Sequence, residues 1–267
     1  VKTVIDSLAT VAVLNEVMAA AGLVQQVLVG LDIGTHREGA RTVEDAMAIA
    51  QAIEASASLE LVGVFAYAGS LQHIVSYPER VRAVTTANQK LDQLVTALKS
   101  RGHQQLIVSG GGTGSAGIDF DFGSYTEIQV GSYVFMDVEY GEVELAPNQS
   151  GDAGQSVFEQ SLWVLTRVIG ANHDGFVTTD AGIKRFSMGG AAPVPGQGAP
   201  AGSRYDFQGD EHGKLILPDG AQSLPLESLV WVRPGHCDPT VNLYDELHVF
   251  EGGELVDIWP IEGRGAI

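Results

Sequence analysis

The sequence contains a single cysteine, Cys237, and few basic residues: 15 Lys and Arg stand against 33 Asp and Glu, for a formal net charge of −18. With one cysteine no disulfide can form within the chain, and the cysteine content gives no sign of an oxidising compartment. A strongly acidic surface repels the phosphates of nucleic acids and of anionic membranes. Neither is therefore expected as a partner.

Long apolar runs and a targeting signal are also missing. No apolar run approaches the roughly 20 residues that span a bilayer, and the N-terminus lacks a basic stretch followed by an apolar one. We therefore predict a cytoplasmic protein outside the membrane. The chain opens at Val1 with VKTVID, which is typical of a strand already under way. We expect part of the fold to precede it.

Apolar strands and amphipathic helices alternate through the first half of the 267-residue chain. Thr42 and Pro78 are typical of helix starts, and Gly22 and Gly102 of helix ends. Continuously apolar strands separated by helices favour parallel pairing through right-handed crossovers. We therefore predict an α/β fold in which residues 1–147 form part of a TIM-type β/α barrel. The expected strands are residues 1–6, 25–34, 59–69 and 104–112, and the expected helices are residues 8–22, 42–56 and 77–102.

The character of the sequence changes from about Asn148, where glycine and proline rise and short strands replace long helices. This pattern predicts a mainly antiparallel β domain over residues 148–267. Residues 187–203 (SMGGAAPVPGQGAPAGS) are expected to form a long exposed loop. The expected strands are residues 161–170, 175–182, 214–218, 228–235 and 242–261.

A glycine-rich stretch, LIVSGGGTGSAG, follows the fourth expected strand and contains five glycines with Thr113 and Ser115. Glycines let backbone N–H groups converge on an anion, so a phosphate group is the expected ligand, and a turn without a ligand is the alternative. In parallel α/β folds, ligands lie beyond the carboxyl ends of the strands, where this stretch falls. No lysine follows Gly114, which excludes a nucleotide P-loop.

The same stretch matches the dinucleotide pattern G-x-G-x-x-G at Gly112, Gly114 and Gly117, with Asp137 about 20 residues on. A nicotinamide-linked oxidoreductase is therefore a competing hypothesis. The dinucleotide pattern must open a helix, however, and the residues that follow, IDFDFGSYTEIQVGS, have poor helical character. This disfavours the dinucleotide interpretation.

Polar side chains also follow the second and third expected strands. Arg37, in LDIGTHREG, would pair with an anionic or phenolic oxygen, or else form a surface ion pair with Glu38 or Glu44. Tyr67, Gln72 and His73 follow the third strand. One of them could take part in proton transfer, although a tyrosine at a strand end also serves for packing.

Three metal-ligand residue types stand side by side in PGHCDPTVNLYD, which begins at residue 234. If this segment is extended, His236 and Asp238 share one face and Cys237 points to the other. An imidazole and a carboxylate without a thiolate suit Mn²⁺, Mg²⁺ or Zn²⁺ with open positions, whereas Cys237 would favour zinc. The alternative is that His236 and Asp238 only hydrogen-bond in a turn at a strand end.

These motifs resemble, in order, those of the D-threonine aldolase and D-serine dehydratase group of metal-activated pyridoxal phosphate enzymes, which have an alanine racemase-type barrel and a β domain. The resemblance covers nearly the whole chain. It rests on the segments LDIGTHREG, GVFAYAGSLQH, SGGGTGS, TEIQVGSYVFMD, DAGIKRFS, DEHGKL, PGHCDPTVNLYD and WPIEGRG.

The resemblance implies a lyase that cleaves D-3-hydroxy amino acids with pyridoxal 5′-phosphate and a divalent metal, and it implies a homodimer. At the metal strand, dehydratases of the group resemble His-x-Cys, whereas aldolases resemble His-x-Asp. Because His236 and Asp238 match His-x-Asp, retro-aldol cleavage is the first expectation and dehydration the second. The residues implied in cofactor binding are Arg37, Gly111, Gly112, Thr113, Gly114 and Tyr133, and those implied in metal binding are His236 and Asp238.

Two departures from the group are visible. Ala68 stands in AYAG where aldolases of this type commonly have a histidine that assists proton removal, so Tyr67 and His73 are the remaining candidates for that role. The lysine that forms the Schiff base in the group would precede Val1. A non-catalytic protein that binds pyridoxal phosphate is therefore a further hypothesis.

Overall fold

The computed structural model describes residues 1–147 and 157–265. The chain divides into two compact units. The first consists mainly of Val1–Gly131, which residues 143–147 join, and the second of Ser132–Glu142 and Phe158–Ile267. The domain boundary predicted between residues 147 and 148 falls at the start of a segment outside the described residues.

The first unit is a five-stranded parallel sheet whose strands follow chain order, β1-β2-β3-β4-β5. A doubly wound sheet would reverse its strand order, whereas a β/α barrel does not. The predicted partial barrel is therefore confirmed. Its strands are β1 (Thr3–Ile5), β2 (Gln25–Gly30), β3 (Leu59–Ala66), β4 (Ile107–Gly110) and β5 (Glu127–Ile128), and its helices are α1 (Leu8–Ala21), α2 (Val43–Glu54), α3 (Tyr77–Ser100) and α4 (Ala116–Phe122), with a 3₁₀ turn, η1 (Gly69–Leu71).

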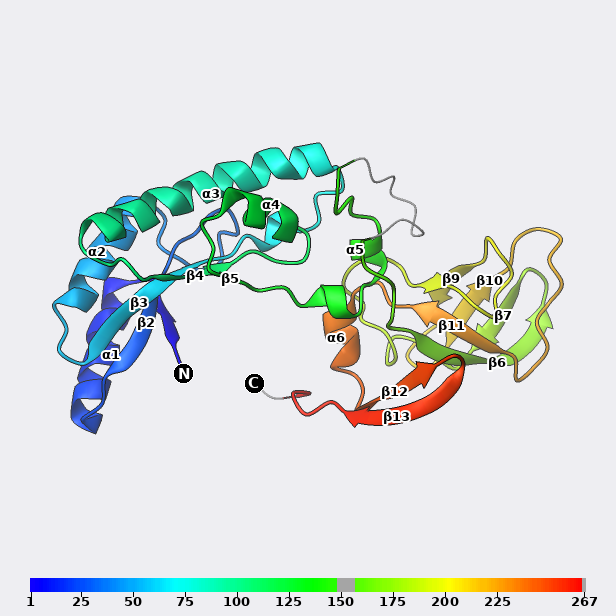
Figure 1. Ribbon diagram of the computed structural model, residues 1–267. Coiled ribbons are helices and arrows are strands. Elements are labelled where there is room, and N and C mark those ends of the chain that lie inside the picture. Colours follow the sequence, from blue (N-terminus) through cyan, green and yellow to red (C-terminus); the bar gives the residue numbers. More distant parts are fainter. Residues whose placement is uncertain (148–156, 266–267) are drawn as a thin grey trace. The chain divides into compact units, whose positions relative to one another are not determined.

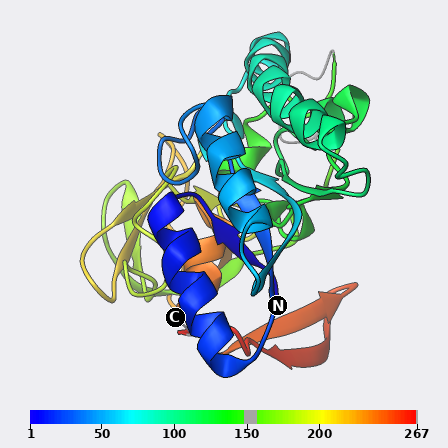
Figure 2. The same ribbon diagram turned by 90° about the vertical axis from the view of Figure 1, so that its left-hand side faces the viewer.

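The helices pack along the sheet one after another, α1 against α2 and α2 against α3 (Figures 1 and 2). The predicted end signals are present: the Thr42 hydroxyl accepts from the N–H of Asp45 at 3.0 Å, and Gly22 ends α1 in the left-handed conformation. Leucine and valine side chains of α3 and β2 are fully buried in a common core. Among the described residues, no helix is both long and apolar enough to cross a membrane.

Strands β3 and β4 approach closely because glycines stand at their contacts. A side chain at Gly63 would begin 2.0 Å from the carbonyl oxygen of Ile107, and one at Gly110 would begin 1.8 Å from that of Ala66. No side chain fits at such distances. The end of β4, from which the glycine-rich stretch starts, is therefore held against the end of β3.

The second unit contains a six-stranded sheet in the order β8-β11-β6-β7-β10-β9, whose pairs are antiparallel, and a two-stranded ribbon, β12-β13. Alternate residues of β6 face the core, as expected for a sheet with one face exposed. The predicted antiparallel domain is thus confirmed. Its elements are η2 (Ser132–Val134), α5 (Val138–Gly141), β6 (Val164–His173), β7 (Phe176–Thr179), β8 (Val194–Pro195), β9 (Arg204–Phe207), β10 (Gly213–Ile216), β11 (Leu229–Arg233), α6 (Cys237–Val241), β12 (Glu246–Glu251) and β13 (Glu254–Pro260).

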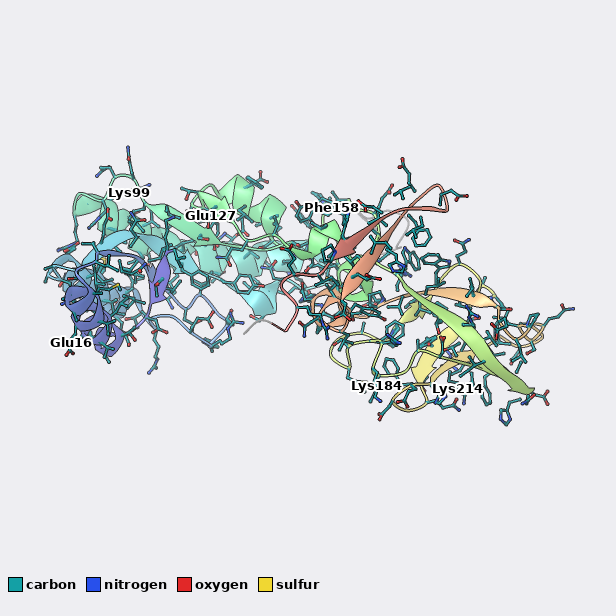
Figure 3. All side chains as sticks on the ribbon, turned by 90° about the horizontal axis from the view of Figure 1, so that it is seen from below. Glu16, Lys99, Glu127, Phe158, Lys184 and Lys214 are labelled. Atoms are coloured by element: carbon teal, nitrogen blue, oxygen red, sulfur yellow. The ribbon has the colours of Figure 1, made fainter. Side chains whose placement is uncertain are left out.

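Two lysines of this unit, which Figure 3 labels, contact neighbouring side chains. Lys184 forms an ion pair of 2.5 Å with Glu211, and the ammonium of Lys214 lies 4.2 Å from the ring centroid of Phe176. The two ammonium groups therefore interact with other side chains of this unit.

Two expectations about local structure were wrong. Helix α4 forms where poor helical character was predicted, because the side chains of Ile118 and Asp119 are buried there and Gly123 supplies a left-handed cap. The expected loop at residues 187–203 contains β8, which pairs with β11.

Candidate functional site

Three strand ends of the first unit carry the residues that the sequence singled out. Arg37 follows β2, Tyr67 and His73 follow β3, and residues 111–114, called the glycine turn below, follow β4. The three strands are parallel neighbours, so their carboxyl ends lie along one edge of the sheet. This is the edge at which ligands bind in such folds.

The glycine turn is buried and can be built only from small residues. Gly111 has a φ of 64°, in the left-handed region. A side chain at Gly112 would begin 2.7 Å from Oε1 of Gln72, and one at Gly114 would begin 2.0 Å from the backbone oxygen of Gln72. The turn is thus packed directly on Gln72, which follows β3.

A buried hydrogen-bond network fixes the inner side of the glycine turn. The Gln72 amide donates from Nε2 to Oγ of Ser115 at 3.0 Å and accepts the Ser115 N–H at 3.1 Å. Oγ of Ser115 also accepts the Gly112 N–H and donates to Asp119 at 2.5 Å. Burial raises the pKa of Asp119, although hydrogen bonds from Asn88 and Ser115 act against the rise.

Gln72 and Ser115 were singled out from the sequence as a proton-transfer candidate and a phosphate donor, whereas Asp119 was not. The two N–H groups at Gly112 and Ser115 are satisfied by the protein itself. The N–H of Gly114 has no acceptor among residues 1–147 and 157–265. Of the turn's amide groups, that of Gly114 is therefore available to an incoming acceptor.

Arg37 lines an open cavity of about 740 Å³ together with Asp32, Arg41 and Lys90. Its guanidinium forms the surface ion pair with Glu38 that the sequence left as an alternative, with NH2 2.5 Å from the carboxylate. This pairing raises the pKa of Arg37, and the hydroxyl of Tyr67 adds a smaller effect in the same direction. With its side chain 64 % exposed, Arg37 remains open to the cavity.

The loop that carries Arg37 is braced by Asp32. Burial opposes ionisation of this carboxyl, but hydrogen bonds from the N–H groups of Gly34 and His36 and from the ring of His36 lower its pKa to about 2. His36 has a φ of 55°, which is uncommon for a residue with a side chain. The ionised Asp32 therefore holds a strained loop in place next to Arg37.

The other predicted residues are placed as follows. Tyr67 is half-buried, with its ring beside Gly69, and His73 is exposed. Ala68 is buried at 5 % exposure. Tyr133 belongs to the second unit, where its ring lies 5.3 Å from that of Phe158. The roles expected of Tyr67, His73 and Tyr133 stay predictions.

The segment PGHCDPTVNLYD is not extended throughout, contrary to the expectation. His236 has an extended backbone and is the N-cap of α6, but helix begins at Cys237, because Asp137 accepts the Cys237 N–H at 2.8 Å and the Thr240 hydroxyl donates to the backbone oxygen of His236. Nε2 of His236 nevertheless lies 3.5 Å from a carboxylate oxygen of Asp238. The side chains of His236 and Asp238 thus lie near each other although the segment is not a strand in which alternate residues share a face.

Asp137 orients His236. Its side chain is fully buried and lies 3.2 Å from Nδ1 of His236, while it accepts the N–H of Tyr140 at 2.8 Å as the N-cap of α5. The hydrogen bond with Asp137 raises the pKa of His236, and the same contact holds the pKa of Asp137 below its usual value despite burial. Nε2 is left directed towards Asp238, which is the arrangement of a metal-binding histidine with a supporting carboxylate.

Asp137, His236 and Cys237 offer an alternative ligand set, since one ligand atom of each lies within 4.8 Å of the others. The Cys237 thiol, however, is fully buried, and burial together with the charges of Asp137 and Asp238 raises its pKa to about 12. His236 and Asp238 stay the predicted pair, because Asp238 is exposed whereas both oxygens of Asp137 already accept hydrogen bonds.

We expect Asp137→Asn to weaken binding of a divalent metal about 10- to 100-fold, because the amide can no longer fix the histidine tautomer by accepting from Nδ1 as a charged group. Equilibrium dialysis with metal analysis measures this. Glu139→Gln is the matched control, since the Glu139 carboxylate lies farther from Nδ1, at 3.6 Å. An equal loss in both variants would contradict the assigned role.

The chain thus joins a parallel β/α unit, with a glycine turn at its strand ends, to an antiparallel unit that carries a His–Asp pair. The sequence profile described as "Alanine racemase, N-terminal domain" matches residues 1–139, and the one described as "Putative serine dehydratase domain" matches residues 161–250. The chain belongs to the alanine racemase N-terminal domain family. The predicted resemblance to D-threonine aldolases and D-serine dehydratases is confirmed.

The chain is similar to 3-hydroxy-D-aspartate aldolase of Paracoccus denitrificans (strain Pd 1222), with 33% identity over 262 residues, and to D-threonine aldolase of Arthrobacter sp, with 35% identity over 261 residues. Each match covers 98% of this chain and 66% of the relative, so the chain spans about two thirds of their length. The crystal structure of D-threonine aldolase from Filomicrobium marinum matches with a TM-score of 0.87 and 31% identity, over 100% of this chain and 70% of that one.

Proposed function

We propose that this protein is a lyase that cleaves D-3-hydroxy amino acids by retro-aldol reaction, with pyridoxal 5′-phosphate and a divalent metal. The observation that carries the proposal is the pairing of His236 with Asp238, oriented by Asp137, in a chain whose relatives include two kinds of D-3-hydroxy amino acid aldolase. A histidine and a carboxylate suit Mn²⁺, Mg²⁺ or Zn²⁺ with positions left open for a substrate.

The first unit fits the cofactor. The N–H of Gly114 is available, and no side chain fits at Gly114 itself. The exposed guanidinium of Arg37 follows strand β2, which is separated from β4 by β3. These donors match a phosphate group and the phenolic oxygen of the pyridine ring. Gly111, Gly112, Thr113 and Gly114 would surround the phosphate, and Arg37 would contact the ring oxygen.

When bound, pyridoxal phosphate stabilises the electron pair left at the substrate α-carbon, and a divalent metal lowers the pKa of the 3-hydroxyl. His236 and Asp238 would hold the ion and so place the 3-hydroxyl. Tyr67 or His73 would take the hydroxyl proton, since Ala68 offers no group for it. Loss of that proton lets the bond between the α- and β-carbons break, which gives glycine and an aldehyde.

Dehydration is the second candidate function, because the serine dehydratase profile matches residues 161–250. The two reactions differ in what happens to the 3-hydroxyl: it is deprotonated in aldol cleavage and leaves as water in dehydration. Asp238 favours aldol cleavage, since the dehydratases of the group resemble His-x-Cys at this place.

The test is to express the complete reading frame, supply pyridoxal phosphate and Mn²⁺, and analyse the products from D-threonine. We expect glycine and acetaldehyde, with more than about 100-fold lower rates after removal of metal by a chelator. Formation of 2-oxobutyrate would establish the dehydratase instead. Cofactor binding without either product would indicate a non-catalytic pyridoxal phosphate-binding protein.

A homodimer and a cytoplasmic location remain part of the proposal. The dimer is implied by the resemblance alone, and light scattering of the complete protein tests it. The single buried cysteine accords with a reducing compartment. Cell fractionation tests the location.

A further inference from the structure

Arg80, on α3, is a fully buried cation that the sequence did not single out. Among residues 1–147 and 157–265, its guanidinium donates only to backbone carbonyl oxygens. Nε donates to Gly114 at 2.7 Å, NH1 donates to Ile74 and to Val75, and NH2 donates to Glu144. Arg80 thus connects the loop after β3, the glycine turn and the segment at residue 144.

The charge of Arg80 is not neutralised by an ion pair within the part of the chain that the structure describes. Glu144 attracts Arg80 electrostatically, but its carboxylate accepts the N–H of Tyr77 at 2.8 Å and forms no ion pair with Arg80. The Tyr77 ring, 5.6 Å from Arg80, adds a weak attraction. A buried charge is normally balanced by an opposite charge or a bound ion, so an anion is expected close by.

The glycine turn is the place for that anion. Arg80 Nε donates to the carbonyl oxygen of Gly114, whose own N–H is open to an acceptor. On the inner side of the turn, Asp119 is occupied by Asn88 and Ser115 and does not contact Arg80. In the described part of the chain, the cation behind the turn therefore has no carboxylate within hydrogen-bonding distance.

We propose that Arg80 is a positioning residue that gives the glycine turn its preference for a phosphate group, by holding Gly114 and by supplying a buried positive charge behind it. Arg80 acts through the turn and does not touch the ligand. This inference rests on the proposed function, because it takes the glycine turn as the site of the cofactor phosphate.

The experiment compares pyridoxal 5′-phosphate with pyridoxal, which lacks the phosphate. Equilibrium dialysis gives the two Kd values for the full chain, and their ratio isolates the contribution of the phosphate. We expect Arg80→Met to reduce the preference for the phosphorylated form at least about tenfold, since a charge in a site of low dielectric acts strongly on a dianion. Arg80→Lys should retain most of the preference because it keeps the charge.

Arg82→Met is the matched control, because Arg82 is exposed on the same helix and its loss changes the net charge equally. The preference of the Arg82→Met variant for pyridoxal 5′-phosphate over pyridoxal should stay within about twofold of that of the unchanged protein, since water and salt screen an exposed charge. If circular dichroism shows that Arg80→Met is unfolded, Arg80→Gln replaces it, because glutamine keeps an N–H donor without the charge. The same ratio of Kd values is then measured for Arg80→Gln.

The outcomes separate the two proposals. An unchanged protein that binds pyridoxal as tightly as pyridoxal phosphate overturns the proposed phosphate site itself. A normal preference in the unchanged protein that persists in the uncharged variant overturns only the role of Arg80. Equal losses in Arg80→Lys and the uncharged variant would assign Arg80 to packing of the turn alone, and this too rejects the electrostatic role.

Discussion

Replacing Asp238 by alanine is expected to lower the affinity for a divalent metal by more than about 100-fold, since partners that only support a ligand are already worth about 10- to 100-fold. Asp238 is one of two protein ligands in the proposed site, and its carboxylate lies 3.5 Å from Nε2 of His236. It is exposed at the start of α6, so its removal should leave the fold intact. Equilibrium dialysis with metal analysis gives the affinity, and circular dichroism checks the fold.

Cys237→Ala is the matched comparison for Asp238→Ala, because it removes the adjacent candidate ligand. We expect the metal affinity of Cys237→Ala to stay within about threefold, since the Cys237 side chain is fully buried whereas Asp238 is exposed. A loss of metal in Cys237→Ala with full binding in Asp238→Ala would reverse the assignment. The ion would then be held by Asp137, His236 and Cys237.

Gly114→Ala is expected to lower the free energy of unfolding of the first unit by about 2–3 kcal/mol, because the added methyl group would begin 2.0 Å from the backbone oxygen of Gln72. Backbone cannot move aside as the end of a side chain can, so the turn itself must shift. Binding of pyridoxal phosphate should fall together with stability. Urea unfolding followed by circular dichroism measures the first effect, and dialysis measures the second.

Gly117→Ala is the control for Gly114→Ala. Gly117 lies three residues further on, in α4, and an added methyl group there meets nothing within 4 Å. Alanine is a better helix former than glycine by about 0.8–1.0 kcal/mol, so stability should rise or stay unchanged. Similar losses at both positions would show that the glycine turn has no special steric requirement.

The alternation of strands and helices in the first half could be predicted from sequence because the signals are local. Thr42 accepts from the third residue after it, Gly22 adopts a left-handed conformation, and Pro78 lies in the first turn of α3. Each acts within one turn of its own helix. Strand β8 was missed because its two residues lie in a stretch rich in glycine and proline, and no local signal marked strand β9.

The candidate site was predictable in its residue types but not in its geometry. His236 and Asp238 were singled out as a pair on the assumption of a strand, yet α6 begins between them. What sets the start of that helix is Asp137, 100 positions upstream, which accepts the Cys237 N–H. No local pattern reports a contact of such sequence separation. Asp119 was missed for the same reason, since its partner Asn88 lies on another element.

The two compact units are interleaved along the chain, because Ser132–Glu142 belongs with the antiparallel unit while residues 143–147 return to the parallel one. Asp137, whose buried carboxylate caps α5 and supports the ring of His236, thus precedes most of its own unit in the sequence. An isolated fragment of the antiparallel unit must accordingly start at Ser132. A fragment cut at residue 148 would contain both proposed metal ligands but would lack the acceptor that orients one of them.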